Sequence, residues 1–172
     1  KAAGVEAGYL EVLMGNEKAI KSYESVGFTR EKELSCYVGQ SLKTDIDLSF
    51  QEIKDINPAK YEPYKNHYLS WEQTDAVVKI NPNLFKCYEL KNGDNIFGFA
   101  IIKPANGQVI QFGVRRDDWS KYGPSLFQKI FQRHPNYKVI NLDIKDKALT
   151  AFFDDHGFKK LVGQWEMSLA IK

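Results

Sequence analysis

A short segment near the start of the chain has the apolar spacing of an amphipathic helix. Apolar residues recur three and four positions apart between Asn16, a favourable N-cap, and Gly27, where a helix is expected to stop. The residues before Asn16, from Tyr9 onward, alternate well enough to predict a strand, and residues 33–38 predict another. The segment is therefore interpreted as a strand–helix–strand element.

The same succession of elements returns near the end of the chain. A strand is expected over residues 139–144, a helix over 147–156 and a final strand over 161–171. Asp146 takes the N-cap position that Asn16 takes in the first segment, and Gly157 takes the stop position of Gly27, at the same offset along the chain. No gap is needed to align the two segments, so we interpret them as two copies of one element.

The chain between these copies predicts a mixed sheet with helices on its faces. Strands are expected over residues 46–53, 84–91, 96–103 and 108–114, and helices over 58–68, 71–80 and 124–133. Together with the second copy, this gives the order β-α-α-β-β-β-α-β-α-β, which is typical of an α/β sandwich. Residues 1–8 are interpreted as the C-terminal end of a helix that stops at Gly4 or Gly8.

Composition narrows the classes of function. Of the 172 residues, 43% are hydrophobic and 27% are charged, with a net charge of +2, as in an ordinary globular protein and unlike a strongly basic nucleic-acid-binding one. No run approaches the roughly 18 apolar residues that span a membrane. Cys36 and Cys87 lie in apolar stretches and are expected to be buried thiols, which suits a cytoplasmic protein. The three histidines share no metal-ligand spacing, so no metal site is expected.

The first copy resembles a signature of the GNAT N-acetyltransferases. The pattern N-x-x-A-x-x-x-Y-x-x-x-G-F after a strand is carried here by Asn16, Ala19, Tyr23, Gly27 and Phe28. The resemblance implies an α/β fold with a mixed, mostly antiparallel sheet and helices on both faces. It also implies acetyl-CoA as cosubstrate, with Asn16 contacting the cofactor arm and Tyr23 acting as general acid for the departing CoA thiolate.

The resemblance also implies a tandem arrangement in which the chain shown begins inside a first domain. Residues 1–40 would be the C-terminal part of that first GNAT domain, 41–45 a linker, and 46–172 a complete but degenerate GNAT-like domain. The apolar strands of residues 9–38 then lack their partners. We expect either that a domain lies upstream or that this piece docks on the second domain or on another copy of the chain.

The second copy departs from the family where chemistry would occur. Asp146 replaces the asparagine and Phe153, which has no proton to donate, replaces the tyrosine. The family's glycine-rich phosphate loop corresponds to residues 118–124, where only Gly123 remains. Lys121 stands in place of the first glycine, and Pro124 removes a backbone donor. Acetyl-CoA binding and catalysis are therefore expected to belong to the first copy.

Three functions follow from these expectations. The first is transfer of an acetyl group from acetyl-CoA to a primary amine on a small molecule or peptide, by a protein without nucleic-acid or membrane partners and with a homodimer as one alternative. The second is an inactive GNAT-like binding or assembly module. The third is binding of another acyl-CoA or a nucleotide through Arg115, Arg116 and Lys121. Tyr61, Tyr64, Tyr68 and Trp71, at helical spacing, are expected to form either core or the wall of a substrate groove.

Overall fold

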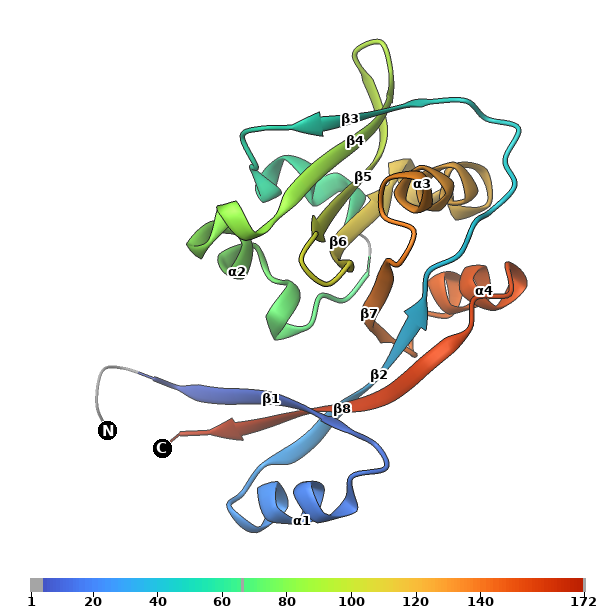
Figure 1. The fold of residues 1–172 in the computed structure, drawn as a ribbon. Coiled ribbons are helices and arrows are strands. Elements are labelled where there is room, and N and C mark those ends of the chain that lie inside the picture. The colour runs from blue at the N-terminus through green and yellow to red at the C-terminus, as the bar shows by residue number, and fades with distance from the viewer. Residues whose placement is uncertain (1–4, 66, 172) are drawn as a thin grey trace.

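The computed structural model describes residues 5–65 and 67–171, and within them the strands form one eight-stranded sheet (Figure 1). Its order is β1-β8-β2-β7-β6-β5-β4-β3. The strands are β1 (Ala7–Leu13), β2 (Thr29–Val38), β3 (Ser49–Ile53), β4 (Lys86–Asn92), β5 (Asn95–Lys103), β6 (Gln108–Val114), β7 (Lys138–Asp143) and β8 (Lys160–Ala170). The pair β6·β7 is parallel and the other pairs are antiparallel.

Helices pack on both faces of this sheet. The α-helices are α1 (Glu17–Ser25), α2 (Asp75–Ile80), α3 (Trp119–Arg133) and α4 (Lys147–Asp155). The 3₁₀ helices are η1 (Pro58–Tyr64), η2 (Trp71–Gln73), η3 (Pro82–Leu84) and η4 (Arg115–Asp117). Helices α3 and α4 share one buried core, whereas η1 and α2 share another with the opposite face of β4–β6. The predicted fold class, a mixed and mostly antiparallel sheet with helices on both faces, is confirmed.

The pairing of β2 with β8 relates the two copies of the repeat. Leu34 lies opposite Gln164, which is its own counterpart in the second copy. On the outer sides of this pair, Leu13 lies opposite Gln164, and Asp143, the counterpart of Leu13, lies opposite Leu34. Equivalent residues that face each other in an antiparallel pair are related by a two-fold axis. The two copies are therefore arranged about a pseudo-two-fold axis between Leu34 and Gln164.

The copies exchange their last strands across this axis. Strand β2, from the first copy, lies between β7 and β8 of the second, and β8 in turn lies between β2 and β1 (Figure 1). The inner strands are well covered, because Leu34, Cys36 and Met167 are all buried. The first strand–helix–strand piece thus docks on the rest of the chain, which is one of the two outcomes expected for its apolar strands.

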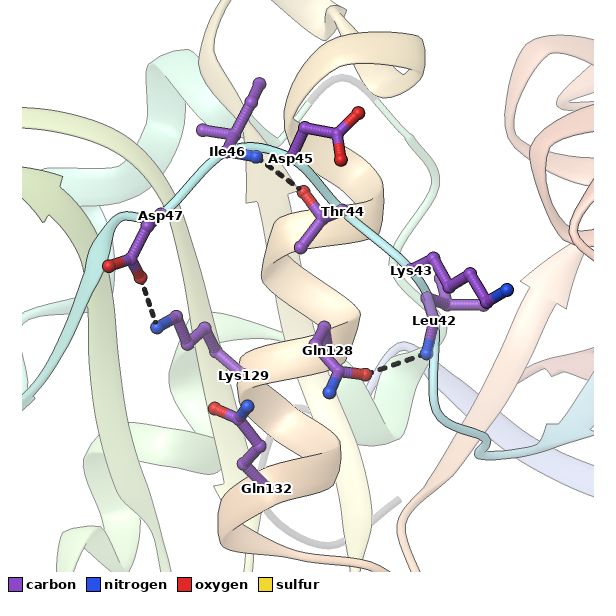
Figure 2. A pocket seen from close by; sticks show the side chains of 9 residues that line it. All are labelled: Leu42, Lys43, Thr44, Asp45, Ile46, Asp47, Gln128, Lys129 and Gln132. Carbon is purple, nitrogen blue, oxygen red and sulfur yellow. Dashed lines mark hydrogen bonds and ion pairs between the residues drawn. The ribbon is translucent and has the colours of Figure 1, made fainter.

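The linker between β2 and β3, residues 39–48, has no helix or strand but is attached to α3. The side-chain oxygen of Gln128 accepts hydrogen bonds from the Leu42 amide at 2.8 Å and from the Ser41 hydroxyl at 3.0 Å. Asp47 forms an ion pair with Lys129 at 2.9 Å (Figure 2). A cavity of about 540 Å³ remains between the segment and the helix. The segment is therefore held in place by side chains of α3.

Two predictions were wrong, one near the start of the chain and one at η1. Residues 1–4 lie outside the described part, but Ala7 and Gly8 begin β1 instead of ending a helix, because they pair with the last residues of β8. The helix expected over 58–68 is a 3₁₀ helix that ends at Tyr64. Pro63 explains the difference, since proline lacks the N–H of a regular helix and disfavours α-helical geometry in the residue before it.

Two other helices differ from prediction in their extent. The helix expected over 71–80 is divided into η2 and α2 at Thr74, which has an extended backbone. Helix α3 begins at Trp119, ahead of the predicted start at Pro124. Pro124 is tolerated because it lies in the second turn, where the carbonyl that it cannot bond belongs to exposed Ser120.

Candidate functional site

The first copy of the repeat begins its helix at Asn16, as the sequence predicts. The Asn16 side-chain oxygen accepts a hydrogen bond from the Ala19 amide at 3.2 Å, so it satisfies one of the free N–H groups of the first turn. Glu17 adds a negative charge where the helix dipole favours one. The Asn16 side chain is exposed, and its Nδ2 group donates no hydrogen bond to the described residues. It is thus free to contact a ligand while it caps α1.

A cavity of about 520 Å³ lies beside Asn16. It is lined by residues of the β1–α1 turn and of β8, namely Leu13, Met14, Gly15, Asn16, Lys160, Val162 and Gly163. Gly163 keeps this region open for Met14, because a Cβ atom at position 163 would lie 2.6 Å from the Met14 sulfur. A mainly apolar lining with one amide and one ammonium group suits an extended acyl chain that carries polar groups.

Tyr23 lies farther along α1 and does not line this cavity. It is half-buried, and its ring contacts Phe28 edge-on with centroids 5.9 Å apart. It packs in a small cluster with Val12, Ile20 and Met167, and its hydroxyl makes no hydrogen bond with the described residues. It is separated from Asn16 by about two helical turns, or roughly 10 Å along the helix axis. The structure therefore places both residues on one helix but brings only Asn16 to the cavity.

The second copy repeats the helix geometry without the same chemistry. The Asp146 carboxylate caps α4 by accepting a hydrogen bond from the Leu149 amide at 3.0 Å. Phe153, the counterpart of Tyr23, is fully buried and stacks on Tyr37 with centroids 4.8 Å apart. Position 153 belongs to the aromatic core between α3, α4 and the sheet. It therefore holds the fold together and has no group that can transfer a proton.

The N-terminus of α3 is capped by the carboxylate of Asp118. Asp118 accepts hydrogen bonds from the Lys121 amide and the Ser120 hydroxyl, both at 3.2 Å. An anion at this helix end would meet that negative charge in place of free N–H groups. Gly123, the glycine that remained of the loop pattern, has a packing role, because a Cβ atom there would lie 2.6 Å from the Phe152 ring. Residues 118–124, where the sequence keeps only Gly123 of the loop pattern, thus form a capped and closely packed start of α3.

The gap between β6 and β7 is filled by side-chain amides of the chain itself. These parallel strands pair only at Gln108–Lys138 and Val109–Val139 within the described residues. Farther along, the Gln73 side chain donates a hydrogen bond to the Ile140 carbonyl at 2.8 Å, and the Gln111 side chain donates one to the Gln73 carbonyl at 2.6 Å. Both glutamines are buried. Two buried glutamines therefore occupy part of the gap between these strands.

Residues Arg115, Arg116 and Lys121 lie near the start of α3. Arg115 and Arg116 are exposed in the turn after β6, and Arg116 has a positive φ of 54°. Arg115 lies over the Phe97 ring at 5.7 Å and Lys121 over the Tyr122 ring at 5.2 Å. Arg115 and Lys121 thus each stack on an aromatic ring of the chain, and the N-terminus of α3 is capped by Asp118.

Sequence reasoning missed Glu11, a carboxylate in the middle of β1. Its side chain points away from α1, because Val12, its neighbour in the strand, packs against that helix. Desolvation by burial, followed by the charge of Glu72, raises the pKa of Glu11 from 4.5 to about 7. A carboxyl group with such a pKa can exchange protons near neutral pH. The sequence feature that could have revealed Glu11 is a single glutamate in an otherwise apolar strand.

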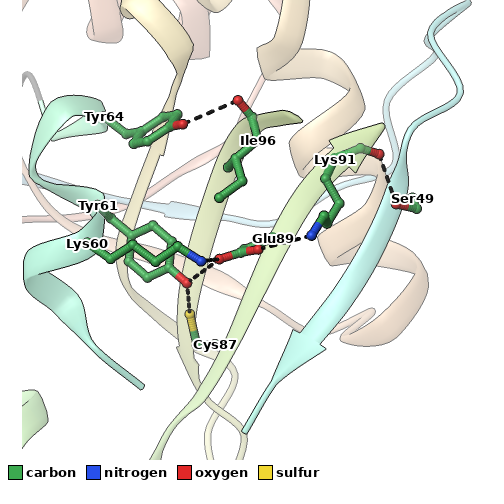
Figure 3. Close-up of polar contacts among 8 residues, drawn as sticks. All are labelled: Ser49, Lys60, Tyr61, Tyr64, Cys87, Glu89, Lys91 and Ile96. Atoms are coloured by element: carbon green, nitrogen blue, oxygen red, sulfur yellow. Dashed lines mark hydrogen bonds and ion pairs between the residues drawn. The ribbon is translucent and has the colours of Figure 1, made fainter. Parts of the chain in front are cut away.

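The buried carboxylate of Glu89, on β4, has a structural role. Its oxygens are bound by Lys60, by the Tyr61 hydroxyl at 2.8 Å and by Lys91 at 3.7 Å (Figure 3). The Tyr61 ring stacks on Phe99 and is fully buried, so it forms core, whereas Trp71 is 39% exposed and can form the wall of a groove. Of the aromatic residues at helical spacing, Tyr61 thus takes the predicted core role and Trp71 fits the predicted role of a groove wall.

The two cysteines are buried, as predicted. Desolvation raises the pKa of Cys87 to about 11, so its thiol stays protonated at neutral pH and is a poor nucleophile. Within the part of the chain that the structure describes, no group of three or more His, Cys, Asp or Glu side chains could hold a metal ion. Among the helices of the same residues, none combines the length and the apolar character needed to cross a membrane.

Comparison with solved structures shows which known proteins share this fold. No family model and no curated protein matches the sequence. A solved structure from Pyrococcus horikoshii, provisionally named as an acetyltransferase, matches with a TM-score of 0.68 and 15% identity over 98% of this chain and 54% of that one. A GCN5-related N-acetyltransferase from Sphaerobacter thermophilus matches with a TM-score of 0.58 and 11% identity over 96% and 60%.

A conserved protein of unknown function from Staphylococcus epidermidis also matches, with a TM-score of 0.64 and 13% identity over 97% of this chain and 73% of that one. The chain spans about half the length of the P. horikoshii protein. In each case, the match covers nearly all of this chain, so it includes the first strand–helix–strand piece as well as the second copy. The chain thus has the mixed α/β fold seen in GCN5-related N-acetyltransferases.

Proposed function

We propose that the protein transfers an acetyl group from acetyl-CoA to a primary amine, with the chemistry at the first copy of the repeat. The cavity beside Asn16 carries this proposal, because it lies at the helix whose sequence resembles the GNAT signature and is lined mainly by apolar groups. Asn16 and Lys160 provide an amide and an ammonium group at its edge. The fold comparisons support the same reaction class.

In this reaction, the neutral amine attacks the thioester carbonyl carbon and a C–N bond forms. The C–S bond then breaks, and the CoA sulfur leaves with the electron pair and takes up a proton. The Tyr23 phenol is proposed to donate that proton, and the amine loses one to solvent or to a base. The cofactor arm is an extended chain. A molecule held at Asn16 can therefore run along α1 toward Tyr23.

The second copy is proposed to act as a scaffold for the first. Its counterparts of Asn16 and Tyr23 are a capping carboxylate and a core phenylalanine, and the buried Gln73 side chain donates a hydrogen bond to β7 where β6 and β7 no longer pair. The exchanged strand β8 supplies Lys160, Val162 and Gly163 to the cavity of the first copy. The proposed domain division into residues 1–40, 41–45 and 46–172 therefore describes two copies that share their strands.

Two substitutions test the proposal on the whole chain. Acetyl-CoA binding is measured by calorimetry, and CoA release is followed with a thiol reagent in the presence of primary amines. Tyr23→Phe should retain binding and lower turnover at least about 100-fold, as expected for loss of a general acid. Tyr122→Phe, which removes a hydroxyl from a half-buried side chain on α3, is the matched control and should leave both quantities unchanged.

Asn16→Asp keeps the helix cap, since Asp146 forms that cap in the second copy. It removes the amide donor and places a negative charge at the edge of the mainly apolar cavity, so acetyl-CoA binding should weaken at least tenfold. Failure of the wild-type chain to bind acetyl-CoA would contradict the proposal. Binding without turnover, unaffected by Tyr23→Phe, would instead favour the inactive binding module.

A further inference from the structure

A third cavity, of about 420 Å³, lies on the side of β1 that faces away from α1. Its walls come from Tyr9 and Glu11 of β1 and from Trp71 and Glu72 of η2, and Asn141 of β7 and Gln164 of β8 form its floor. Glu11 and Asn141 are counterparts in the two copies of the repeat. The cavity therefore lies close to the pseudo-two-fold axis, where side chains of both copies meet.

The described side chains that line this cavity include acidic groups that no basic side chain among them offsets. Glu11 and Glu72 line it, and no lysine or arginine is present among the described residues that line it. The Oε1 atom of Glu11 is shielded from solvent and has no hydrogen-bond partner among the described residues. Isolated buried carboxylate oxygens are unfavourable unless a donor or a cation reaches them. The Ser70 hydroxyl and the Asn141 amide favour the ionised form of Glu11, but its Oε1 atom remains an acceptor without a close partner among the described residues.

The neighbouring carboxylates do not share this property. Glu166 accepts hydrogen bonds from the Tyr68 hydroxyl and from the Trp71 amide at 3.3 Å. Asp143 pairs with Lys32, whose ammonium group also lies 4.0 Å from the centre of the Tyr68 ring. These groups are satisfied within the protein. Among these carboxylates, only Glu11 has a buried oxygen, Oε1, without a hydrogen-bond partner among the described residues.

The floor and walls of the cavity are suited to a cation. The Asn141 side chain is buried, donates to the Ser70 hydroxyl at 3.1 Å and accepts from the Cys36 thiol at 3.7 Å, so it is fixed in place. Trp71 and Tyr9 are 39% and 54% exposed, so their rings are accessible. Carboxylates combined with accessible aromatic rings form a favourable environment for an ammonium group.

We propose that this cavity binds the ammonium group of a cationic amine, with Glu11 as the principal anionic contact and Trp71 and Tyr9 as aromatic walls. That this amine is the acetyl acceptor rests on the function proposed above, but the binding itself does not. The site joins β1 of the first copy to η2 of the second. The second copy then contributes to recognition although it has lost the groups for catalysis.

Binding should depend on pH through Glu11. The groups that face it are Glu72 from η2, Glu166 from β8, Ser70 before η2 and Asn141 from β7. Burial and the two carboxylates raise the pKa of Glu11 to about 7, while Ser70 and Asn141 partly oppose this shift. An ammonium ligand attracts the ionised form, so affinity should fall as pH decreases through 7. The ligand itself stays protonated, since alkylamines have pKa values near 10.

The test is a calorimetric titration of the whole chain with 1,4-diaminobutane at pH 8 and pH 5.5 and constant ionic strength. Wild-type protein should bind at least tenfold more weakly at pH 5.5. Glu11→Gln should lower affinity at pH 8 at least tenfold, whereas the matched control Glu17→Gln, an exposed glutamate on α1, should not. Glu72→Gln removes a charge that raises the pKa of Glu11, so binding should persist to lower pH than in the wild type.

Equal affinity of the wild type and Glu11→Gln at pH 8 would overturn the proposal, as would equal losses in Glu11→Gln and Glu17→Gln. Acetyl-CoA binding is titrated separately on the same proteins and should be unchanged in Glu11→Gln. If diaminobutane binds through Glu11 but acetyl-CoA does not bind, the acetyltransferase proposal fails and the cation site stands. If acetyl-CoA binds and diaminobutane does not, the cation site fails alone.

Discussion

The buried carboxyl group of Glu11 should make the stability of the protein depend on pH in a defined direction. Its pKa is raised from 4.5 to about 7 in the folded protein, mainly by desolvation. The folded state therefore binds this proton more tightly than the unfolded state. The stabilisation is complete below pH 4.5 and is lost as pH rises through 7.

The size of this effect follows from the two pKa values. A difference of about 2.5 corresponds to about 3 kcal/mol, and solvent screening at this half-buried side chain reduces the expected effect to about 1–2 kcal/mol. Glu11→Gln replaces the carboxyl group with a neutral one of similar shape. The variant should match the wild type near pH 4.5 and exceed it by this amount at pH 8.

The measurement is urea denaturation of both proteins between pH 4.5 and 8.5, with the difference in the free energy of unfolding taken at each pH. Using the difference removes the titration of every group that the two proteins share. Glu17→Gln serves as control and should show a difference near zero at all pH values. A Glu11→Gln difference that stays constant, or that favours the wild type as pH rises, would refute the reasoning.

Three other substitutions have clear expectations. Gly123→Ala should destabilise the fold by about 1–3 kcal/mol in urea denaturation, because its Cβ atom would overlap the Phe152 ring. Lys60→Met should cost about 1–2 kcal/mol at pH 7 and less below pH 4. Although burial opposes it, the hydrogen bond from Lys60 helps to lower the pKa of Glu89, so the pair contributes stability only while Glu89 is ionised. Leu34→Ala should cost about 2–5 kcal/mol and keep one unfolding transition, because its strand joins both copies.

Matched controls accompany these measurements. Gly15→Ala introduces a Cβ atom with nothing within 4 Å, and Leu84→Ala truncates a side chain that is 51% exposed. Both should change stability by less than about 0.5 kcal/mol. Two separate transitions in Leu34→Ala, or a Gly123→Ala variant as stable as the wild type, would show that the packing argument is incorrect at that position.

The repeat could be predicted from sequence because its signals are local. Asn16 and Asp146 both cap their helices through the side-chain oxygen, and Gly27 and Gly157 both adopt positive φ, at 100° and 69°. Each of these features depends on a few neighbouring residues. The same element therefore appears twice with one offset, and its geometry follows from the sequence alone.

The start of α3 could not be predicted in the same way. Pro124 is a strong local signal for a helix start, and the preceding residues matched a loop pattern. In the structure, Trp119 is buried against Phe152 and Phe112, and Asp118 provides a cap. Burial of a large aromatic side chain outweighs the missing hydrogen bond at Pro124. That gain depends on residues distant in the chain.

The sequence by itself thus determined the order of elements, the fold class, the constant offset between the copies and the candidate residues Asn16 and Tyr23. Only the tertiary structure decided that the copies exchange β2 and β8, that Asn16 borders a cavity while Tyr23 packs beside Phe28, and that Glu11 faces another cavity. Caps, stops and periodicity act over a few residues. Strand pairing, by contrast, joins segments from opposite ends of the chain and is set by which apolar faces can be buried together.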